Sequence, residues 1–263
     1  MVESDKILFR GEDISALGRR QLRSARRDMQ MVFQDPYSSL DPRMTVFDLV
    51  AEPLREICRG LPRAQARERV LDTMELCGLP AEYADSYPHE LDGGRRQRVG
   101  LARAMVTEPK FVVCDEPVSA LDVSIQSQVI NLLHDLQEKL GLTYLFIAHD
   151  LNIVKYISDR IAVMYLGNVV ELASSDELYK NTLHPYSQAL LSAVPIPDPS
   201  AEAQKHRIII SGDVPSPINT PKGCNFAGRC PKVCDQCKES KPPLQEITPG
   251  HYVACHLVQP EKK

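Results

Sequence analysis

The stretch that decides the fold is Phe111-Val112-Val113-Cys114-Asp115-Glu116, close to the middle of the chain. Its four apolar residues, two of them β-branched, predict a buried strand of a parallel sheet. Pro117 ends that strand, because proline has no backbone N–H to give to a neighbouring strand. Ligands of open α/β sheets bind at the carboxyl ends of the strands. We therefore expect an α/β fold with Asp115 and Glu116 at its binding edge, although a plain strand end that leads into a loop would show the same pattern.

The two adjacent carboxylates favour one kind of chemistry. A first carboxylate at a strand end can hold a hydrated Mg²⁺ ion, and a second can orient or deprotonate a water molecule. Asp115 is therefore the candidate magnesium ligand, and Glu116 is the candidate catalytic group.

The composition is that of an ordinary globular protein. With 263 residues, 43% of them hydrophobic and 25% charged, the chain can form one large domain and an appendage. The formal net charge of -4 gives no indication of nucleic-acid binding. No signal peptide is visible after Met1, and no apolar run approaches the roughly 20 residues that span a bilayer. Any role at a membrane is therefore expected to be peripheral.

Further motifs lie on both sides of the central strand. Gln34 follows the apolar run Met31-Val32-Phe33, and His149 follows Leu145-Phe146-Ile147-Ala148, so both are expected at strand ends. Asp92-Gly93-Gly94 begins an expected helix, where glycines let the backbone approach a ligand and free N–H groups bind anions. Beside a carboxylate pair and an anion site, the histidine is best interpreted as a contact to a phosphate.

Taken in order, the motifs resemble those of ATP-binding-cassette (ABC) transporter ATPases. The Q-loop, signature, Walker B motif, D-loop and switch histidine would be Gln34, Leu91 to Val99, Asp115-Glu116, Ser119 to Asp122 and His149. The resemblance implies an α/β, P-loop NTPase-like core with a helical subdomain at about residues 37–90, and it implies ATP and Mg²⁺ as cofactors. The catalytic residues that it implies are Glu116, His149 and Gln34. The residues that it implies for binding ATP and Mg²⁺ are Asp115 on the metal, Asp92, Gly93, Gly94 and Asp122.

The chain departs from this family at two places. None of its 263 residues forms a Walker A loop, Gly-x-x-x-x-Gly-Lys-Ser/Thr, whose N–H groups and lysine cradle the phosphates. We therefore expect an incomplete, N-terminally truncated core, or a first part on another polypeptide, with apolar surface left uncovered and no ATP hydrolysis by this chain alone. In the signature, Asp92 replaces the family's serine and Arg95 its glutamine. An ionised aspartate cannot donate to a phosphate, so we expect good helix capping but impaired phosphate binding.

The last third of the chain differs in composition. Residues 175–194 predict a helix, and the proline-rich stretch from Pro195 to Pro221 predicts a linker. We expect a truncated nucleotide-binding domain at residues 1–195 and a small C-terminal domain at residues 196–263. The segment His184 to Leu191 and the cysteine-bearing end resemble the dipeptide and oligopeptide importer branch of the ABC family.

Five of the eight cysteines cluster in this C-terminal region. In a chain without a visible secretion signal, such a cluster suggests a metal site before disulfides. The importer branch implies a 4Fe–4S cluster, and a tetrahedral Zn²⁺ ion or four reduced thiols are the alternatives. The cysteines at the matching positions are Cys224, Cys230, Cys237 and Cys255. Cys234 falls outside this set, and His251 and His256 are less favoured ligands for zinc.

These motifs lead to two main hypotheses. The first is an ATP-hydrolysing importer subunit for dipeptides or oligopeptides, peripheral at the cytoplasmic face of the membrane. Its implied partners are a second ABC ATPase subunit, in a homo- or heterodimer, transmembrane permease subunits and, indirectly, an extracytoplasmic peptide-binding protein. The second hypothesis is a non-catalytic interaction subunit or gene fragment that docks a permease or an intact ATPase. A cassette ATPase of DNA repair or translation is a distant third, because it has no need of the cysteine-bearing arm.

Overall fold

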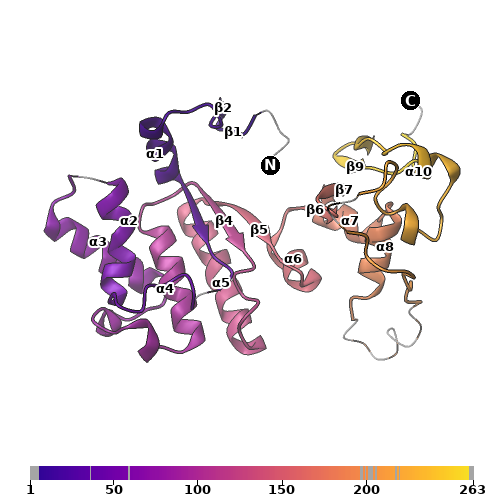
Figure 1. The fold of residues 1–263 in the computed structure, drawn as a ribbon. Coiled ribbons are helices and arrows are strands. Elements are labelled where there is room, and N and C mark those ends of the chain that lie inside the picture. Colours follow the sequence, from indigo (N-terminus) through magenta and orange to yellow (C-terminus); the bar gives the residue numbers. More distant parts are fainter. Residues whose placement is uncertain are drawn as a thin grey trace. The chain divides into compact units, whose positions relative to one another are not determined.

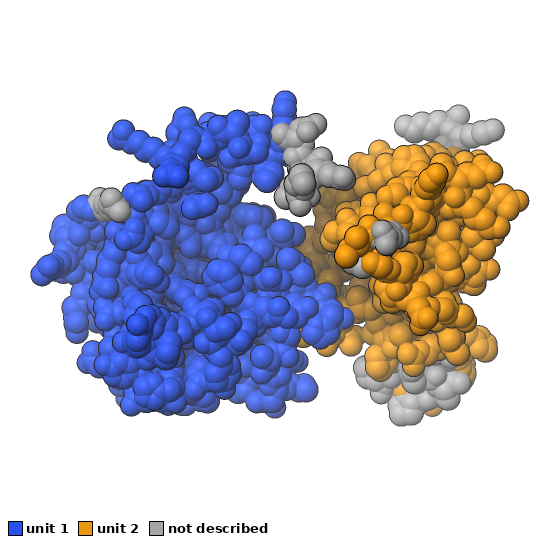
Figure 2. Space-filling view, in the orientation of Figure 1, with its two compact units in different colours: residues 1–149 blue, residues 150–263 orange. Residues whose placement is uncertain are grey.

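The computed structural model describes residues 6–35, 37–58, 60–195, 198, 200, 204, 206–216, 218 and 220–260. The chain divides into two compact units, unit 1 at residues 1–149 and unit 2 at residues 150–263 (Figure 1 and Figure 2). Ile196 and Pro197, next to the predicted domain boundary, lie outside the described residues, so that boundary stays a prediction. None of the helices in the described part combines the length and the apolar character needed to cross a membrane.

Unit 1 is built around a parallel three-stranded sheet with the strand order β3-β4-β5 (Figure 1). The strands of this sheet are β3 (Met29–Val32), β4 (Phe111–Asp115) and β5 (Thr143–Ile147). Two short strands, β1 (Leu8–Phe9) and β2 (Glu12–Asp13), pair separately. The helices are α1 (Arg19–Asp28), α2 (Val46–Ile57), α3 (Arg63–Leu76), α4 (Gly93–Met105) and α5 (Val123–Leu140), with the 3-10 turns η1 (Ala81–Tyr83) and η2 (Pro88–Glu90).

Helices cover one face of this sheet. Val32, Val112 and Cys114 lie on that face, and each is no more than 1% exposed. Helix α4 packs against β3, and the Tyr144 hydroxyl of β5 donates to the carbonyl of Leu133 in α5 at 3.0 Å. The predicted strand at residues 111–115 is confirmed, and its burial comes from these helices.

The opposite face of the sheet carries exposed apolar side chains. Met31, Leu145 and Ile147 are 38%, 50% and 45% exposed. The register aligns Met31 with Val113 and Val113 with Leu145, so one row of apolar residues crosses all three strands on this face. The expected uncovered apolar surface is therefore present in the described part of unit 1.

The segment after β3 is helical, in line with the helical subdomain that the family resemblance implied. One face of α2 is buried to 2% exposure or less, and its residues are Val46, Leu49, Val50 and Leu54. The Thr45 hydroxyl caps α2 by accepting a hydrogen bond from the Asp48 N–H at 3.2 Å. In its described residues, the predicted helical subdomain contains α2, α3, η1 and η2 before α4 begins.

Unit 2 contains a four-stranded antiparallel sheet with the order β6-β7-β9-β8 (Figure 1). Its strands are β6 (Arg160–Tyr165), β7 (Asn168–Ser174), β8 (Gln245–Thr248) and β9 (His251–Val253). Its helices are α6 (Leu151–Ile157), α7 (Ser175–Lys180), α8 (Pro185–Ser192) and α10 (Asp235–Glu239), with the 3-10 turn η3 (Ala227–Arg229). Gly167, at a φ of 74°, lies in the turn of the β6–β7 hairpin.

The prediction of one continuous helix over residues 175–194 was wrong. The structure has α7 and α8, and the chain between them is not helical. Pro185 is the first residue of α8, a position where its missing N–H costs no helical hydrogen bond. The Glu171 carboxylate accepts hydrogen bonds from the N–H groups of Leu183 and His184, at 2.7 and 3.1 Å. These contacts satisfy the backbone where the helix is interrupted.

Candidate functional site

The carboxyl ends of the three parallel strands form the candidate site. Asp115 is the last residue of β4 and is half-buried. The next residue, Glu116, adopts a φ of 43°, in the left-handed region that residues other than glycine rarely occupy. Its N–H donates to the Ile147 carbonyl at 2.9 Å, and its carbonyl accepts from the Ser119 N–H at 3.2 Å. Hydrogen bonds on both sides thus hold this strained backbone, a kind of strain that is common at functional sites.

The Glu116 side chain is the centre of this edge. Its Oε2 accepts a hydrogen bond from Gln34 Nε2 at 2.7 Å, and its Oε1 lies 3.4 Å from His149 Nδ1. The Glu116 side chain is 25% exposed, whereas that of His149 is 72% exposed. The structure therefore brings together the three predicted catalytic residues, from loops that follow three different strands. A carboxylate held in this way can accept a proton from a nearby water molecule.

The glycine-rich segment forms a second group at the start of α4. Asp92 is the N-cap residue of α4, and its Oδ1 accepts from the Arg95 N–H at 2.7 Å. Its Oδ2 pairs with Arg95 Nη1 at 2.5 Å, and the same guanidinium lies 4.9 Å from the centre of the Tyr83 ring. Arg95 therefore offsets part of the charge that Asp92 introduces, and Asp92 caps the helix as expected.

Packing explains one of the two glycines at this position. A Cβ atom added at Gly94 would lie 2.8 Å from Ile125 Cγ2, whereas one added at Gly93 would meet Leu121 Cδ2 at 3.4 Å. Asp122 caps α5 by accepting from the Ile125 N–H at 3.0 Å. Sequence analysis assigned both glycines to ligand approach and missed Ile125, whose contact makes a side chain at Gly94 unfavourable. The ligand-binding roles of Asp92, Gly93, Gly94 and Asp122 stay predictions.

The carboxylates at the strand edge suit Mg²⁺ by their chemistry, because hard oxygen donors are the ligands that this ion prefers. Among the described residues, no group of three or more His, Cys, Asp or Glu side chains is arranged to hold a metal ion. A magnesium ion at Asp115 would take its remaining oxygen ligands from other sources, such as water molecules and a bound phosphate.

The four cysteines of the predicted cluster lie in different apolar surroundings. Cys224 and Cys230 pack against the buried Phe226 cluster, whereas Cys255 belongs to a cluster with Ile247. Burial raises the pKa of the Cys230, Cys237 and Cys255 thiols. No group of three or more thiols among the described residues is arranged to hold a metal ion, and the iron–sulfur or zinc site at these four cysteines stays a prediction.

The two histidines considered as zinc ligands have other partners. His256 Nε2 lies 3.0 Å from the Ser240 carbonyl oxygen. His251 is 1% exposed, and its Nε2 lies 2.9 Å from Glu171 Oε1, while its Nδ1 lies 3.4 Å from Glu177 Oε1. Sequence analysis missed this buried Glu171–His251 pair, since nothing in the local pattern joins residues so far apart. Its position ties β7 to β9, and we interpret it as structural.

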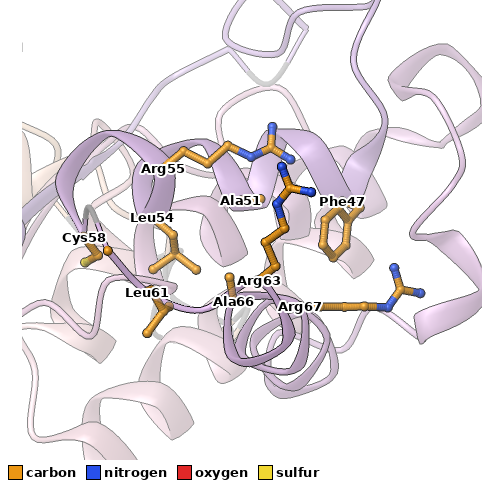
Figure 3. Close-up of a pocket in the computed structure, with 10 residues that line it drawn as sticks. Phe47, Ala51, Leu54, Arg55, Cys58, Leu61, Arg63, Ala66 and Arg67 are labelled. Carbon is orange, nitrogen blue, oxygen red and sulfur yellow. The ribbon is translucent and has the colours of Figure 1, made fainter.

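Helices α2 and α3 border an open groove with a volume of about 580 Å³ (Figure 3). Its floor is apolar and includes Phe47, Ala51 and Leu54 of α2. The guanidinium of Arg67 lies 5.5 Å from the centre of the Phe47 ring, and Arg55 pairs with Asp48 at 2.6 Å. The groove thus combines an apolar floor with a basic rim.

Comparisons with known proteins identify the family to which this chain is related. A family model described as "ABC transporter" matches residues 1–119, and one described as "Oligopeptide/dipeptide transporter, C-terminal region" matches residues 170–237. The oligopeptide transport ATP-binding protein AppF of Bacillus subtilis is 51% identical over 253 residues, which are 96% of this chain and 77% of AppF. The oligopeptide transport ATP-binding protein OppF of Haemophilus influenzae is 50% identical over 250 residues, which are 95% of this chain and 75% of OppF.

Solved structures of ATP-binding cassettes share the fold. The structure of cbiO1 from Clostridium perfringens, part of the ABC transporter complex cbiONQ, matches with a TM-score of 0.61 and 30% identity, over 68% of this chain and 69% of that one. A dimeric structure of the ATP-binding cassette MJ0796 bound to ADP and Pi matches with a TM-score of 0.57 and 29% identity, over 65% of this chain and 73% of that one. The protein belongs to the oligopeptide-transport ATP-binding proteins of the ABC transporter family.

Proposed function

We propose that this protein is the ATP-hydrolysing subunit of an importer for dipeptides or oligopeptides. The observation that carries the proposal is the Glu116 group, in which Gln34 and His149 contact one carboxylate at the carboxyl edge of a parallel sheet. Mg·ATP, when bound, would supply the terminal phosphate and the cation that offsets its charge.

The residues of this chain have separate roles in the proposed reaction. Glu116 accepts the proton of the attacking water at its carboxylate, and the Gln34 amide orients that carboxylate through Oε2. His149 is mostly exposed and lies beside Oε1, so its ring can turn toward a phosphate oxygen while it stays next to Glu116. Asp115, at the end of β4, would hold the Mg²⁺ ion that accompanies the nucleotide.

The proposed partners follow from the same surfaces. A second ABC ATPase subunit would face the start of α4, in line with the dimeric form of the MJ0796 structure. Permease subunits would dock on unit 1 close to the α2–α3 groove, whose apolar floor and basic rim suit an amphipathic segment with acidic residues (Figure 3). An extracytoplasmic peptide-binding protein would take part indirectly, and the subunit would be peripheral at the cytoplasmic face of the membrane.

A second candidate function is a non-catalytic interaction subunit. It is favoured by Asp92 in the signature, which replaces the serine that the family resemblance implies. Such a subunit would dock on a permease or an intact ATPase. It would bind ATP only weakly and would not hydrolyse it.

Two measurements separate these candidates. The first titrates the full chain with Mg·ATP, and micromolar binding would contradict the non-catalytic function. The second measures hydrolysis by a chimera in which a Walker A-bearing segment precedes Met1. Hydrolysis by the chimera supports the catalytic function, and its absence from a folded chimera that binds Mg·ATP counts against it.

The metal content of the cysteine-bearing end is a separate question. No step of the proposed function depends on a metal cluster at Cys224, Cys230, Cys237 and Cys255. A brown sample with visible absorbance would support the iron–sulfur prediction, and a colourless sample that contains zinc would reject it.

A further inference from the structure

Helix α1 concentrates positive charge in unit 1. Five of the chain's 31 lysine and arginine residues fall within the ten residues of this helix, although the whole chain has a formal net charge of -4. The five are Arg19, Arg20, Arg23, Arg26 and Arg27. The net charge of the chain therefore does not describe the charge of this part of its surface.

The five arginines share one side of α1, which we call the arginine face. Successive residues of an α-helix are rotated by about 100°, so the five positions fall within an arc of about 120°. All five are exposed, whereas Leu22, Ala25 and Asp28 on the other side of the helix are half-buried. Because α1 contacts α2 and β3, the arginine face is directed away from these elements and toward solvent.

The arginine face lacks acidic partners within the described part of the chain. None of its five side chains forms an ion pair with a described residue, and Asp28, the one acidic residue of α1, pairs with Arg10 at 2.7 Å. Residues four apart on a helix are neighbours, so Arg23 is repelled by both Arg19 and Arg27. A negatively charged partner would relieve this repulsion.

The position of α1 favours a membrane as that partner. Helix α1 contacts α2, and α2 also supplies the floor of the groove on which permease docking is proposed (Figure 1 and Figure 3). A subunit docked through that groove would hold α1 beside the permease and therefore close to the surrounding lipid. This part of the argument rests on the proposed function, whereas the charge and exposure of α1 do not.

The shape of the arginine face separates two kinds of anionic partner. The outer side of a helix is convex, whereas peptides bind in grooves or along sheet edges. An extended anionic surface therefore fits the arginine face better than an acidic peptide does. From Arg19 to Arg27 the helix rises by about 12 Å, so its side chains can reach several headgroups at once.

We propose that the arginine face of α1 binds the anionic phospholipid headgroups of the membrane surface directly. Guanidinium groups form paired hydrogen bonds with phosphate oxygens, and each basic residue close to an anionic bilayer strengthens the binding. Helix α1 precedes β3, so it lies at the amino ends of the parallel strands, and Glu116 lies at their carboxyl ends. The contact with lipid thus leaves the candidate site open.

The experiment sediments the full-length chain with two kinds of vesicle, one of phosphatidylcholine alone and one of equal parts phosphatidylcholine and phosphatidylglycerol. We expect the chain to bind the anionic vesicles, to bind the neutral ones much more weakly, and to be released as the salt concentration rises. The neutral vesicles measure any contribution of the exposed apolar side chains of the sheet. Neither vesicle contains a permease or a nucleotide, so a failure here leaves the proposed ATPase function untouched.

A triple variant, Arg19→Gln with Arg20→Gln and Arg23→Gln, tests the arginine face itself. Glutamine is a good helix former, so α1 should persist, and circular dichroism checks that it does. The affinity of this variant for the anionic vesicles should fall by about 10–100-fold, because three of the five cations are gone.

The matched control variant removes the same number of positive charges elsewhere. It combines Lys139→Gln, Arg160→Gln and Lys180→Gln, three exposed positions outside α1. Its net charge equals that of the α1 variant, so a general effect of charge would weaken both variants alike. We expect the control to bind the anionic vesicles with the affinity of the wild type.

Two results would overturn the proposal. One is equal binding of the α1 variant and the control variant to the anionic vesicles. The other is a wild-type chain that shows no preference for anionic over neutral vesicles. If that chain binds immobilised polyglutamate and the α1 variant does not, the partner of the arginine face is an acidic protein segment.

Discussion

Two glutamate–histidine pairs in this protein differ in exposure and therefore in what they can do. Glu116 and His149 lie at the edge of the parallel sheet, with side chains that are 25% and 72% exposed. Glu171 and His251 lie inside unit 2, with side chains that are 0% and 1% exposed. The first pair can meet a substrate and exchange protons with water, whereas the second can only hold its surroundings together. The comparison shows that residue types alone do not identify a catalytic pair, and that solvent access separates the two roles.

The largest expected effect is on the chemistry at the exposed pair. In the chimera that carries a Walker A segment, Glu116→Gln should lower the rate of ATP hydrolysis by about 10²–10⁴-fold, because the amide cannot accept the proton of the attacking water. Binding of Mg·ATP should persist. Glu138→Gln, on the exposed face of α5, is the matched control and should hydrolyse ATP at the wild-type rate. Equal rates for both variants would remove Glu116 from the mechanism.

The next effect is on stability at the buried pair. His251→Ala leaves the Glu171 carboxylate buried without its partner and should destabilise unit 2 by about 3–5 kcal/mol. His149→Ala, the corresponding change at the exposed pair, should alter stability by no more than about 0.5 kcal/mol. Hydrogen exchange of the β7 and β9 amides measures the first change. Similar protection in the two variants would show that exposure does not distinguish the pairs.

A third prediction concerns the pH dependence of stability that the buried His184 in unit 2 causes. Burial lowers the pKa of His184 to about 4, and its Nδ1 accepts from the Tyr186 N–H at 3.1 Å, so protonation removes that bond. Between about pH 6.5 and pH 4 the unfolded chain binds a proton at His184 and the folded chain does not, so stability falls as the pH falls. The loss should reach about 3 kcal/mol at most.

His184→Asn tests that origin. Asparagine keeps an acceptor and is a favourable N-cap residue, but it does not titrate in this range. Urea unfolding at pH 7 and pH 4.5 should therefore show a smaller difference in the variant than in the wild type. An unchanged pH dependence would place the titrating group elsewhere.

The smallest effect tests whether the glycine-rich segment serves packing. Gly94→Ala should destabilise unit 1 by about 1–3 kcal/mol, because the added Cβ meets Ile125. Gly100→Ala, in the same helix and with open space around its Cβ position, should be neutral or slightly stabilising. Thermal unfolding of both variants measures the difference. If both substitutions change the stability by the same small amount, Gly94 is not needed for packing, and ligand approach is its remaining predicted role.

Much of unit 1 could be predicted because its signals are local. The apolar run before Asp115 defines β4, and Asp122 and Gly141 mark the limits of α5, which spans Val123–Leu140. The grouping of Gln34, Glu116 and His149 could be predicted because parallel strands end at a common edge. Their roles in hydrolysis stay predictions.

Unit 2 was harder to predict because its decisive contacts are remote in sequence. The Glu171 carboxylate interrupts the expected helix at Leu183 and His184, and it binds His251 in another strand. Sequence analysis likewise left Cys234 outside the predicted set of metal ligands, because a cysteine's position in the chain does not show which thiol it faces. The contact between Cys234 and Cys237 could be found only from their positions in space.

The bare side of the parallel sheet has a practical consequence for anyone who purifies this protein. Met31, Leu145 and Ile147 form an exposed apolar surface on unit 1, and such surfaces associate with one another as the protein is concentrated. Preparations should therefore be monodisperse when dilute and form larger species on concentration. Leu145→Lys should raise the protein concentration at which these larger species appear.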